Sequence, residues 1–405
     1  MSTVRRWVSF AAVFLVGFVA FFNMFKVAPL MPVLLQSNMG FDPSNIGWLM
    51  SMFSVIGIIL AFPAGMLINK IGPKATLLAA AGCCFVGSLV GALAPNAAVL
   101  FASRFIEGAG SSLASVAASV AITILIPPKS QGLAQALNVD SFPLSTFAAM
   151  NLAPLLMVAT GIWNAVWWFG VVFSAFVFVY TALFFKLPDV ANPTRGEGSG
   201  ESVPAGDVPV DMKPIWSSIV FVGLVFCLWN VVSSGAVSNF FPMYLQNGMG
   251  LDAQASGLIT SVASVIVIIA SPFAGAFADR VGHRKWFLIF GIVGMAVFTP
   301  AAFSGNMGLV WVFVVLWGVF QAALPPNVYA IIPELARNPK AIVASMALVA
   351  VFQNGGTAVG SAMMGPLMAN LGWFGSATMV LMPICAVGAV FAFLVRAGKP
   401  TTREL

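Results

Sequence analysis

Four ionisable side chains stand inside long apolar stretches of the sequence, where a charge needs a special reason. They are Lys26, Arg104, Glu107 and Asp140. A lysine or arginine in an apolar medium can neutralise an anion, and a carboxylate there can take up and release a proton. If these stretches cross a lipid bilayer, each ion costs about 3 kcal/mol or more and should face the protein interior with a partner. These four residues are therefore the first candidates for the chemistry of the chain.

The composition places the apolar stretches in a membrane. Of the 405 residues, 60% are hydrophobic and 7% are charged, and the mean hydropathy is +1.00. A soluble domain usually has about 25% charged residues, so this chain cannot cover a globular surface in water. The alternating pattern of an outer-membrane barrel is absent. We therefore predict an all-α membrane protein whose surroundings are the lipid bilayer.

Twelve transmembrane helices are predicted, separated by short breaks rich in Gly, Pro and Asn. Each is close to or above the roughly 20 residues that a membrane helix needs. The N-terminal apolar run is longer than a signal peptide and has no clear cleavage site, so we expect a retained first helix. The predicted spans are 7–35, 45–69, 75–94, 98–126, 131–158, 164–187, 214–245, 254–279, 285–304, 309–335, 341–370 and 374–397.

The basic residues mark one side of the membrane. All lysines and arginines except Lys26 and Arg104 lie in the termini, in the central segment or in alternate loops, and the loops of the other parity hold none. The positive-inside rule then places both termini in the cytoplasm. We expect a multi-pass protein of the cell (inner) membrane. Because topology explains the pI of about 9.4, we expect no nucleic-acid partner.

The sequence divides into two similar halves. Residues 188–213 are rich in Gly, Pro, Ser and acidic residues, which indicates a flexible cytoplasmic linker. At a constant offset of 210, Gly47 aligns with Gly257, and Lys70 with Arg280. We therefore predict an N-terminal six-helix half, 1–187, and a C-terminal six-helix half, 214–405. Transporters built from such repeats place their binding site near the midplane between them.

Two loop motifs carry a resemblance to a known family. GMLINKIGPK (65–74) and GAFADRVGHRK (275–285) resemble the signature loop of the major facilitator superfamily, and RFIEGAG (104–110) resembles its second motif. The resemblance covers nearly the whole chain and names no subfamily. It implies that the loops latch one conformation, although they could also be topology signals alone. The implied latch residues are Gly65, Asn69, Gly72, Asp279, Arg280, Gly282 and Arg284; Asn69 departs from the family's acidic residue.

The same resemblance implies that helices 1, 4, 7 and 10 line a central cavity, helped by 2, 5, 8 and 11. Helical rise places Lys26 and Glu107 about 13 Å deep in one layer and Asp140 about 13 Å from the other side. The double proline at 325–326 is expected to interrupt helix 10. The candidate substrate-binding residues are Lys26, Asn23, Arg104, Asn230, Ser234, Gln321, Tyr329, Gln353 and Asn354. Interhelical hydrogen bonds are the alternative for many of them, and Lys26 could instead be a structural partner of Glu107.

Two cations and one carboxylate in one layer leave one positive charge, which an anionic substrate would satisfy. We therefore predict an alternating-access secondary transporter of a small organic or inorganic anion of the monocarboxylate type. Either proton coupling or exchange would fit, with Asp140 or Glu107 as the coupling residue. The first alternative is a proton-driven exporter of amphipathic drugs. The G-x-x-x-G-P-x-x-G-G pattern of many drug/proton antiporters is missing from helix 5, which counts against it.

An enzyme or a receptor is the other alternative, and the residue types disfavour it. The only histidine is His283, and the four cysteines form no CxxC or Cys/His pattern. A nucleophile–base pair or a metal cluster, which hydrolytic chemistry needs, is not visible. We therefore expect no enzymatic activity, no metal, no cofactor and a monomeric carrier of a small molecule.

Overall fold

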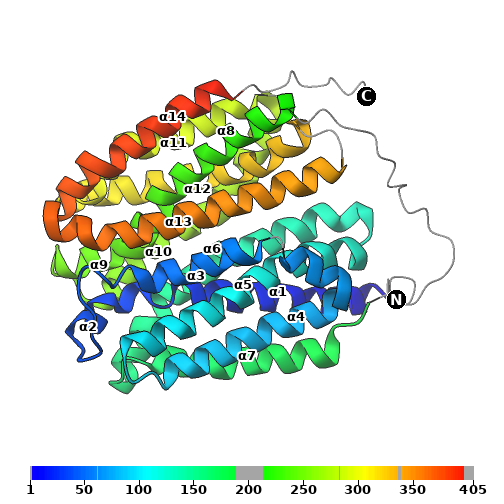
Figure 1. Ribbon diagram of the computed structural model, residues 1–405, viewed down its shortest axis with the longest axis horizontal. Helices are drawn as coiled ribbons and strands as arrows, with labels where there is room; N and C mark the ends of the chain where they lie inside the picture. The colour runs from blue at the N-terminus through cyan, green and yellow to red at the C-terminus, as the bar shows by residue number, and fades with distance from the viewer. Residues whose placement is uncertain (1, 62, 188–212, 282, 336–338, 396–405) are drawn as a thin grey trace.

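The computed structural model describes residues 2–61, 63–187, 213–281, 283–335 and 339–395, and these residues form helices joined by turns. The predicted linker therefore lies outside the described residues, except for Lys213. The helices run roughly along the long axis of the molecule (Figure 1). The end that holds Thr3 and Val395 is called the terminal end below, and the end that holds the turn 37–47 is called the opposite end.

Several α-helices, among them Ala97–Leu125 and Met307–Leu335, begin and end close to the predicted positions. Local signals set several ends: the side chain of Asn96 accepts a hydrogen bond from the amide of Val99 before α5, and Gly161 ends α6 with a positive φ of 73°. The helices are α1 (Thr3–Phe25), α2 (Met31–Gln36), α3 (Trp48–Leu60), α4 (Pro63–Ala92), α5 (Ala97–Leu125), α6 (Pro128–Thr160), α7 (Ala165–Phe184), α8 (Lys213–Asn230), α9 (Asn239–Asn247), α10 (Ala253–Val281), α11 (Arg284–Ala302), α12 (Met307–Leu335), α13 (Pro339–Ser376) and α14 (Met382–Leu394).

Within the described residues, ten helical stretches are long and apolar enough to cross a membrane. One of them, Ser345–Leu394, has 50 residues, far more than one crossing of about 30 Å requires. Gly372 has a positive φ of 66° and divides it into two spans. The short apolar helix Trp48–Leu60 starts another span. Gly72, with φ of 80°, separates the end of that span from the next one. Counted this way, the twelve predicted spans are present, and the predicted all-α membrane fold is confirmed.

The first span is broken in the middle, which the sequence prediction of one helix over 7–35 missed. The α-helix α1 ends at Phe25, a 3₁₀ turn covers Ala28–Leu30, and α2 starts at Met31. Pro29 and Pro32 have no N–H group and cannot extend the hydrogen-bond ladder. The first span therefore holds two helical pieces with free backbone carbonyls at the junction.

The expected interruption at the double proline is wrong. Helix α12 runs unbroken from Met307 to Leu335 through Pro325 and Pro326. The fixed φ of proline, about −65°, fits an α-helix, so the lost hydrogen bonds need not end the helix when neighbouring helices support it. Irregular backbone appears elsewhere, as π-helical turns at Val231–Ser238 and Ala377–Leu381.

The first seven helices lie together on one side of the molecule and the last seven on the other (Figure 1). The two sides meet where α3 packs on α13 and α6 packs on α10. Near the opposite end this junction is tight, because glycines there face backbone carbonyls. A Cβ on Gly47 would lie 2.0 Å from the carbonyl oxygen of Ser361, and a Cβ on Gly257 would lie 2.0 Å from that of Met150.

Hydrogen bonds reinforce the junction near the opposite end. Ser51 Oγ donates to the carbonyl of Ala358 at 2.8 Å. Gln246 Nε2 donates to the carbonyl of Pro29 at 3.0 Å. Neither bond involves a charged group, so the two sides are held there by backbone contact and neutral hydrogen bonds.

At the terminal end the two sides carry matching lysine contacts. Lys74 Nζ, at the start of the span after Gly72, donates to the carbonyl of Ala182 near the end of α7 at 3.0 Å. Lys285 Nζ, at the start of α11, donates to the carbonyl of Phe393 near the end of α14 at 2.6 Å. A cation stabilises the negative C-terminal end of a helix. At the offset of 210, both partners of the second contact lie one residue beyond the positions that correspond to Lys74 and Ala182.

The glycine contacts predict a measurable difference between two substitutions in α13. A Cβ on Gly365 would lie 2.0 Å from the carbonyl oxygen of Pro43, whereas a Cβ on Gly355 meets only Ile58 Cδ1 at 4.0 Å. Gly365→Ala should destabilise the protein by about 1–3 kcal/mol through overpacking. Gly355→Ala should leave it unchanged or stabilise it by up to about 1 kcal/mol, because alanine favours the helix. Thermal unfolding of the purified protein in nanodiscs measures both; equal melting temperatures would contradict the packing described here.

Candidate functional site

Lys26 lies at the break in the first span and is fully buried. Its ammonium donates to Asn23 Oδ1 at 2.8 Å, to Ser88 Oγ at 3.1 Å and to Glu107 Oε1 at 2.6 Å. The nitrogen also lies 5.2 Å from the ring centre of Trp167. All three protons of the ammonium therefore have an acceptor from the same half of the chain.

Arg104 lies beside this pair and holds the end of α1. Its Nη1 donates to Glu107 Oε2 and to the carbonyl of Asn23, both at 2.5 Å. Its Nη2 donates to the carbonyl of Met24 at 2.8 Å. The carbonyls of the last helical turn have no partner inside the helix, and the guanidinium fork supplies one. We name Lys26, Arg104 and Glu107, with their partners Asn23 and Ser88, the buried polar cluster.

The buried polar cluster has one more cationic than anionic side chain, and the end of a helix lies beside it. Lys26 and Arg104 carry two positive charges against the one carboxylate of Glu107, and all three side chains are fully buried. The end of a helix carries about half a negative charge on its free carbonyls, and Arg104 contacts that end of α1 directly. The break in the first span thus offsets much of the positive charge that the sequence left unexplained. Contact between Lys26 and a substrate stays a prediction.

A small pocket, called the central pocket below, lies between the two sides of the molecule. Its volume is about 20 Å³, which is room for about one water molecule. From the first half it is lined by Phe25, Phe142, Pro143, Thr146 and Met150. From the second half it is lined by Ser238, Thr260, Ala263, Ser264, Val267, Trp317 and Gln321. None of these side chains is charged.

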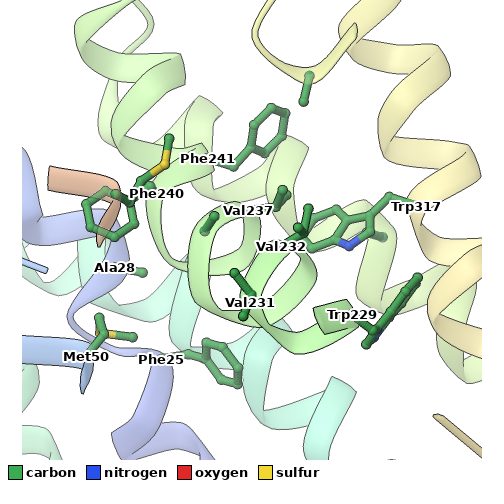
Figure 2. Close-up of a cluster of buried hydrophobic side chains, with 14 of the residues drawn as sticks. Phe25, Ala28, Met50, Trp229, Val231, Val232, Val237, Phe240, Phe241 and Trp317 are labelled. Atoms are coloured by element: carbon green, nitrogen blue, oxygen red, sulfur yellow. The ribbon is translucent and has the colours of Figure 1, made fainter. Parts of the chain in front are cut away.

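Aromatic rings form much of the pocket wall. Phe25 and Phe142 meet edge to face with ring centres 5.3 Å apart. Trp317 Nε1 donates to Ser233 Oγ at 3.1 Å, which fixes the indole ring. Figure 2 shows Phe25 and Trp317 on either side of the π-helical segment that carries Val231, Val232 and Val237. The position of Phe25 follows from the end of α1 at this residue, so the break in the first span shapes the pocket.

Most hydroxyl groups of the pocket use their hydrogen on their own helix. Thr146 Oγ1 donates to the carbonyl of Phe142 at 3.0 Å, and Thr260 Oγ1 donates to that of Ser256 at 2.8 Å. Ser238 Oγ donates to the carbonyl of Ser233 at 3.0 Å, a span of five residues that the π-helix allows. These oxygens therefore offer lone pairs to the pocket.

The predicted binding residues of the second half divide into two groups. Gln321 lines the pocket. The others form bonds within the helices or between them: Asn230 Nδ2 to the Phe226 carbonyl at 2.7 Å, Ser234 Oγ to Asn230 Oδ1 at 3.0 Å, Tyr329 Oη to Gln353 Oε1 at 2.6 Å and Asn354 Nδ2 to the Ala350 carbonyl at 2.9 Å. Their contact with a substrate stays a prediction.

The two predicted coupling residues have different surroundings. Glu107 accepts hydrogen bonds from Lys26, Ser88 and Arg104. Asp140 is partly exposed on α6, and no described residue gives it a hydrogen bond or an ion pair. It precedes the pocket residue Pro143 by three positions, about 4.5 Å of helical rise toward the terminal end. A carboxylate without a partner can change protonation without breaking a contact.

The predicted latch can be described only in part. Gly72 has the positive φ of 80° that a tight turn requires of glycine. Arg280 is exposed, and Arg284 Nη1 donates to Asn327 Oδ1 in α12 at 3.2 Å. Gly65 lies in α4 with open space around it. The side chains of Asn69 and Asp279, and Gly282 itself, lie outside the description, so the latch stays a prediction.

Several pocket residues were missed by the sequence prediction. Gln321 was predicted, whereas Trp317, Thr260 and Ser264 were not. Trp317 lies four residues before Gln321, and Thr260 lies four residues before Ser264, so each pair shares a helix face. That spacing was available in the sequence, but Trp and Thr are common in membrane helices and carried no distinct signal. In the part of the chain that the structure describes, no group of three or more His, Cys, Asp or Glu side chains could hold a metal ion.

Comparison with known proteins gives relatives of similar organisation. "Uncharacterized MFS-type transporter YhcA" of Bacillus subtilis (strain 168) is 23% identical over 323 residues, 67% of this chain and 59% of YhcA, so the match spans less than two thirds of that protein. "Uncharacterized MFS-type transporter YwfA" of the same strain is 23% identical over 91% of this chain and 86% of YwfA. "Multidrug resistance protein MdtG" of Dickeya zeae (strain Ech586) is 29% identical over 45% of this chain and 44% of MdtG.

A solved structure supports the fold. The crystal structure of a D-xylose-proton symporter superposes with a TM-score of 0.80 over 98% of this chain and 99% of that chain, at 16% sequence identity, which is a likeness of fold alone. The family model described as Major Facilitator Superfamily matches residues 13–256 and 230–405. The match takes in nearly the whole chain and agrees with the loop motifs and the twelve spans, and the protein therefore belongs to the major facilitator superfamily of membrane transporters.

Proposed function

We propose that this chain is a secondary active transporter that binds a small amphipathic organic solute in the central pocket. The observation that carries the proposal is the lining of this pocket: both halves contribute, the side chains are aromatic, aliphatic or neutral polar, and none is charged. Ligand sites are mostly apolar with a few polar groups that set orientation. A transporter, rather than an enzyme, fits a site whose hydroxyl groups have no base beside them in the pocket lining.

Alternating access is the proposed mechanism, with residues 1–187 and 214–405 as the two rocking units. The glycine and hydrogen-bond contacts near the opposite end close that side in this conformation. The distribution of basic residues supports an inner-membrane protein with cytoplasmic termini, so the closed side would face outward.

The names of relatives give independent support for a small-molecule solute. One matched relative is named a multidrug resistance protein, and one structural neighbour is named a sugar–proton symporter. The uncharged aromatic pocket favours amphipathic solutes, as in the exporter alternative, despite the helix 5 pattern that counted against drug export. We propose Asp140, rather than Glu107, as the proton-coupling residue, because only Asp140 lacks partners among the described residues.

A small monocarboxylate-like anion is the second candidate substrate. The buried polar cluster favours it, since two cations face one carboxylate there. Against it, the carbonyls that end α1 offset the second cation, and Lys26 would have to leave Glu107 to reach a solute. The two candidates predict that solute uptake depends on different residues: the pocket residues for an amphipathic solute, and Lys26 for an anion.

Removal of the indole at Trp317 should reduce transport of an amphipathic probe. In proteoliposomes with an imposed pH gradient of either sign, Trp317→Ala should lower uptake of N-phenyl-1-naphthylamine about tenfold, because the ring forms the pocket wall. Trp311→Ala is the matched control, since Trp311 is on the same helix and 42% exposed. Gln321→Ala, which removes a pocket amide without opening the core, should also lower uptake. Equal loss in the Trp311 control, or none in either pocket variant, contradicts the proposed site.

Asp140→Asn should separate transport from the proton gradient. Uptake driven by a pH gradient should fall to the level without a gradient, while exchange of labelled for unlabelled probe at equal pH continues, because the amide cannot carry a proton. Asp252→Asn serves as control: Asp252 Oδ1 accepts from the Ala255 amide, and asparagine caps a helix equally well. If gradient-driven uptake by Asp140→Asn matches that of the unchanged protein, Asp140 is not the coupling residue.

Lys26→Gln tests the anion candidate and the buried polar cluster together. Loss of one partner of a buried ion pair costs about 3–5 kcal/mol, so Lys26→Gln should lower the melting temperature. The double variant Lys26→Gln/Glu107→Gln should recover part of that loss, because the two residues are coupled. We expect no saturable benzoate uptake in either the unchanged protein or the variants. Saturable benzoate uptake by the unchanged protein that is absent from both Lys26→Gln and the more stable double variant would instead favour the anion candidate.

A further inference from the structure

The polar groups of the pocket offer more hydrogen-bond acceptors than donors to a solute. The hydroxyl hydrogens of Thr146, Ser238 and Thr260 are already donated to carbonyls of their own helices. A hydroxyl has one hydrogen and two lone pairs, so each of these groups can still accept a hydrogen bond from a solute but has no second hydrogen to donate. The indole N–H of Trp317 is likewise donated, to Ser233.

Few donors remain for a solute. Within the described part of the chain, Gln321 and Ser264 line the pocket without a hydrogen-bond partner of their own. Gln321 offers both an N–H group and a carbonyl, and Ser264 offers one hydroxyl. No cationic side chain lines the pocket, because Lys26 and Arg104 are bound within the buried polar cluster. A carboxylate, which only accepts hydrogen bonds, would find these two donors and no positive charge.

The aromatic rings of the pocket wall also favour a cation over an anion. The faces of Phe25, Phe142 and Trp317 carry negative charge density, which attracts a cation and repels an anion. An ammonium group has three N–H donors and a positive charge. It therefore matches the surplus of acceptors, and the aromatic rings that line this pocket supply further groups that attract a cation.

We infer that the central pocket selects organic ammonium compounds, that is, amines protonated at neutral pH with an apolar body, over carboxylates of the same shape. The inference rests on the proposed function, because it assigns the substrate class of the same pocket. The pocket of this conformation is small, about 20 Å³, so binding must move its lining side chains apart. The shape of this conformation therefore does not select between solutes. The charged or polar end group of the solute does.

Three probes of similar size test the inference on the full-length protein in nanodiscs. They are 2-phenylethylammonium, 2-phenylethanol and phenylacetate, which share a ring and differ in the terminal group. Binding at pH 7 is measured by isothermal calorimetry and by the shift in melting temperature. The ammonium should bind about tenfold more tightly than phenylacetate, with the alcohol between them.

Substitution of the accepting hydroxyls should reduce this preference. Thr146→Val and Thr260→Val keep the volume and remove an acceptor, so each should weaken binding of the ammonium several-fold and leave phenylacetate unchanged. Thr160→Val is the matched control: Thr160 is on the same helix as Thr146 and also donates to its own helix, at 2.7 Å to Leu156, but it lies outside the pocket. It should change none of the three affinities.

The outcomes separate this inference from the proposed function. If phenylacetate binds as tightly as the ammonium or more tightly, and Trp317→Ala weakens its binding, the pocket is a solute site and the ammonium assignment is wrong. Tightest binding of the alcohol, with the ammonium no better than phenylacetate, also overturns the assignment. If no probe binds, or Trp317→Ala leaves all affinities unchanged, the proposed site fails and the inference fails with it.

Discussion

The contact between Arg104 and the end of α1 is the interaction on which the rest of the site depends. A break inside a membrane span leaves carbonyls without partners, and no water is available in the bilayer to satisfy them. Arg104 donates to the carbonyls of Asn23 and Met24 and is itself held by Glu107. With its end fixed, α1 places Phe25 in the pocket wall. After the break, the 3₁₀ turn Ala28–Leu30 places the carbonyl of Pro29 where Gln246 of the other half donates to it.

The same contact explains why the charges and the pocket are separate. Lys26 and Phe25 are adjacent in the chain, but the ammonium is directed into the first half, to Ser88 and Glu107, whereas Phe25 lines the pocket. The helix end supplies part of the negative charge that the cluster lacks. The ions of the buried polar cluster therefore lie within the first half, and the pocket lining consists of neutral groups. Selectivity in such a pocket comes from hydrogen bonds and aromatic faces, which discriminate less sharply than a salt bridge.

The sequence predicts the large-scale structure and part of the cluster. Length and hydropathy are enough for the twelve spans, and helical rise places Lys26 and Glu107 at one depth, where the structure pairs them. The sequence does not predict which proline breaks a helix: Pro29 follows a break that Arg104 stabilises, while Pro325 and Pro326 lie in a continuous helix. The π-helical turn at Val231–Ser238 is equally hidden, because an inserted residue shifts facing without changing composition. Which residues of this segment line the pocket depends on the direction in which their side chains point.

The position of the charges also bears on how the two halves could move. The proposed rocking would separate the contacts near the opposite end, where Gly47 and Gly257 face backbone carbonyls and Ser51 donates to Ala358. These are van der Waals contacts and neutral hydrogen bonds, each worth about 1 kcal/mol, and water can replace them once the side opens. Separation of Lys26 from Glu107 would instead leave a buried charge without a partner, at several kcal/mol. Because the whole cluster lies within the first half, it can move as part of a rigid unit, and the proposed motion would separate the neutral contacts described above without breaking an ion pair of the cluster.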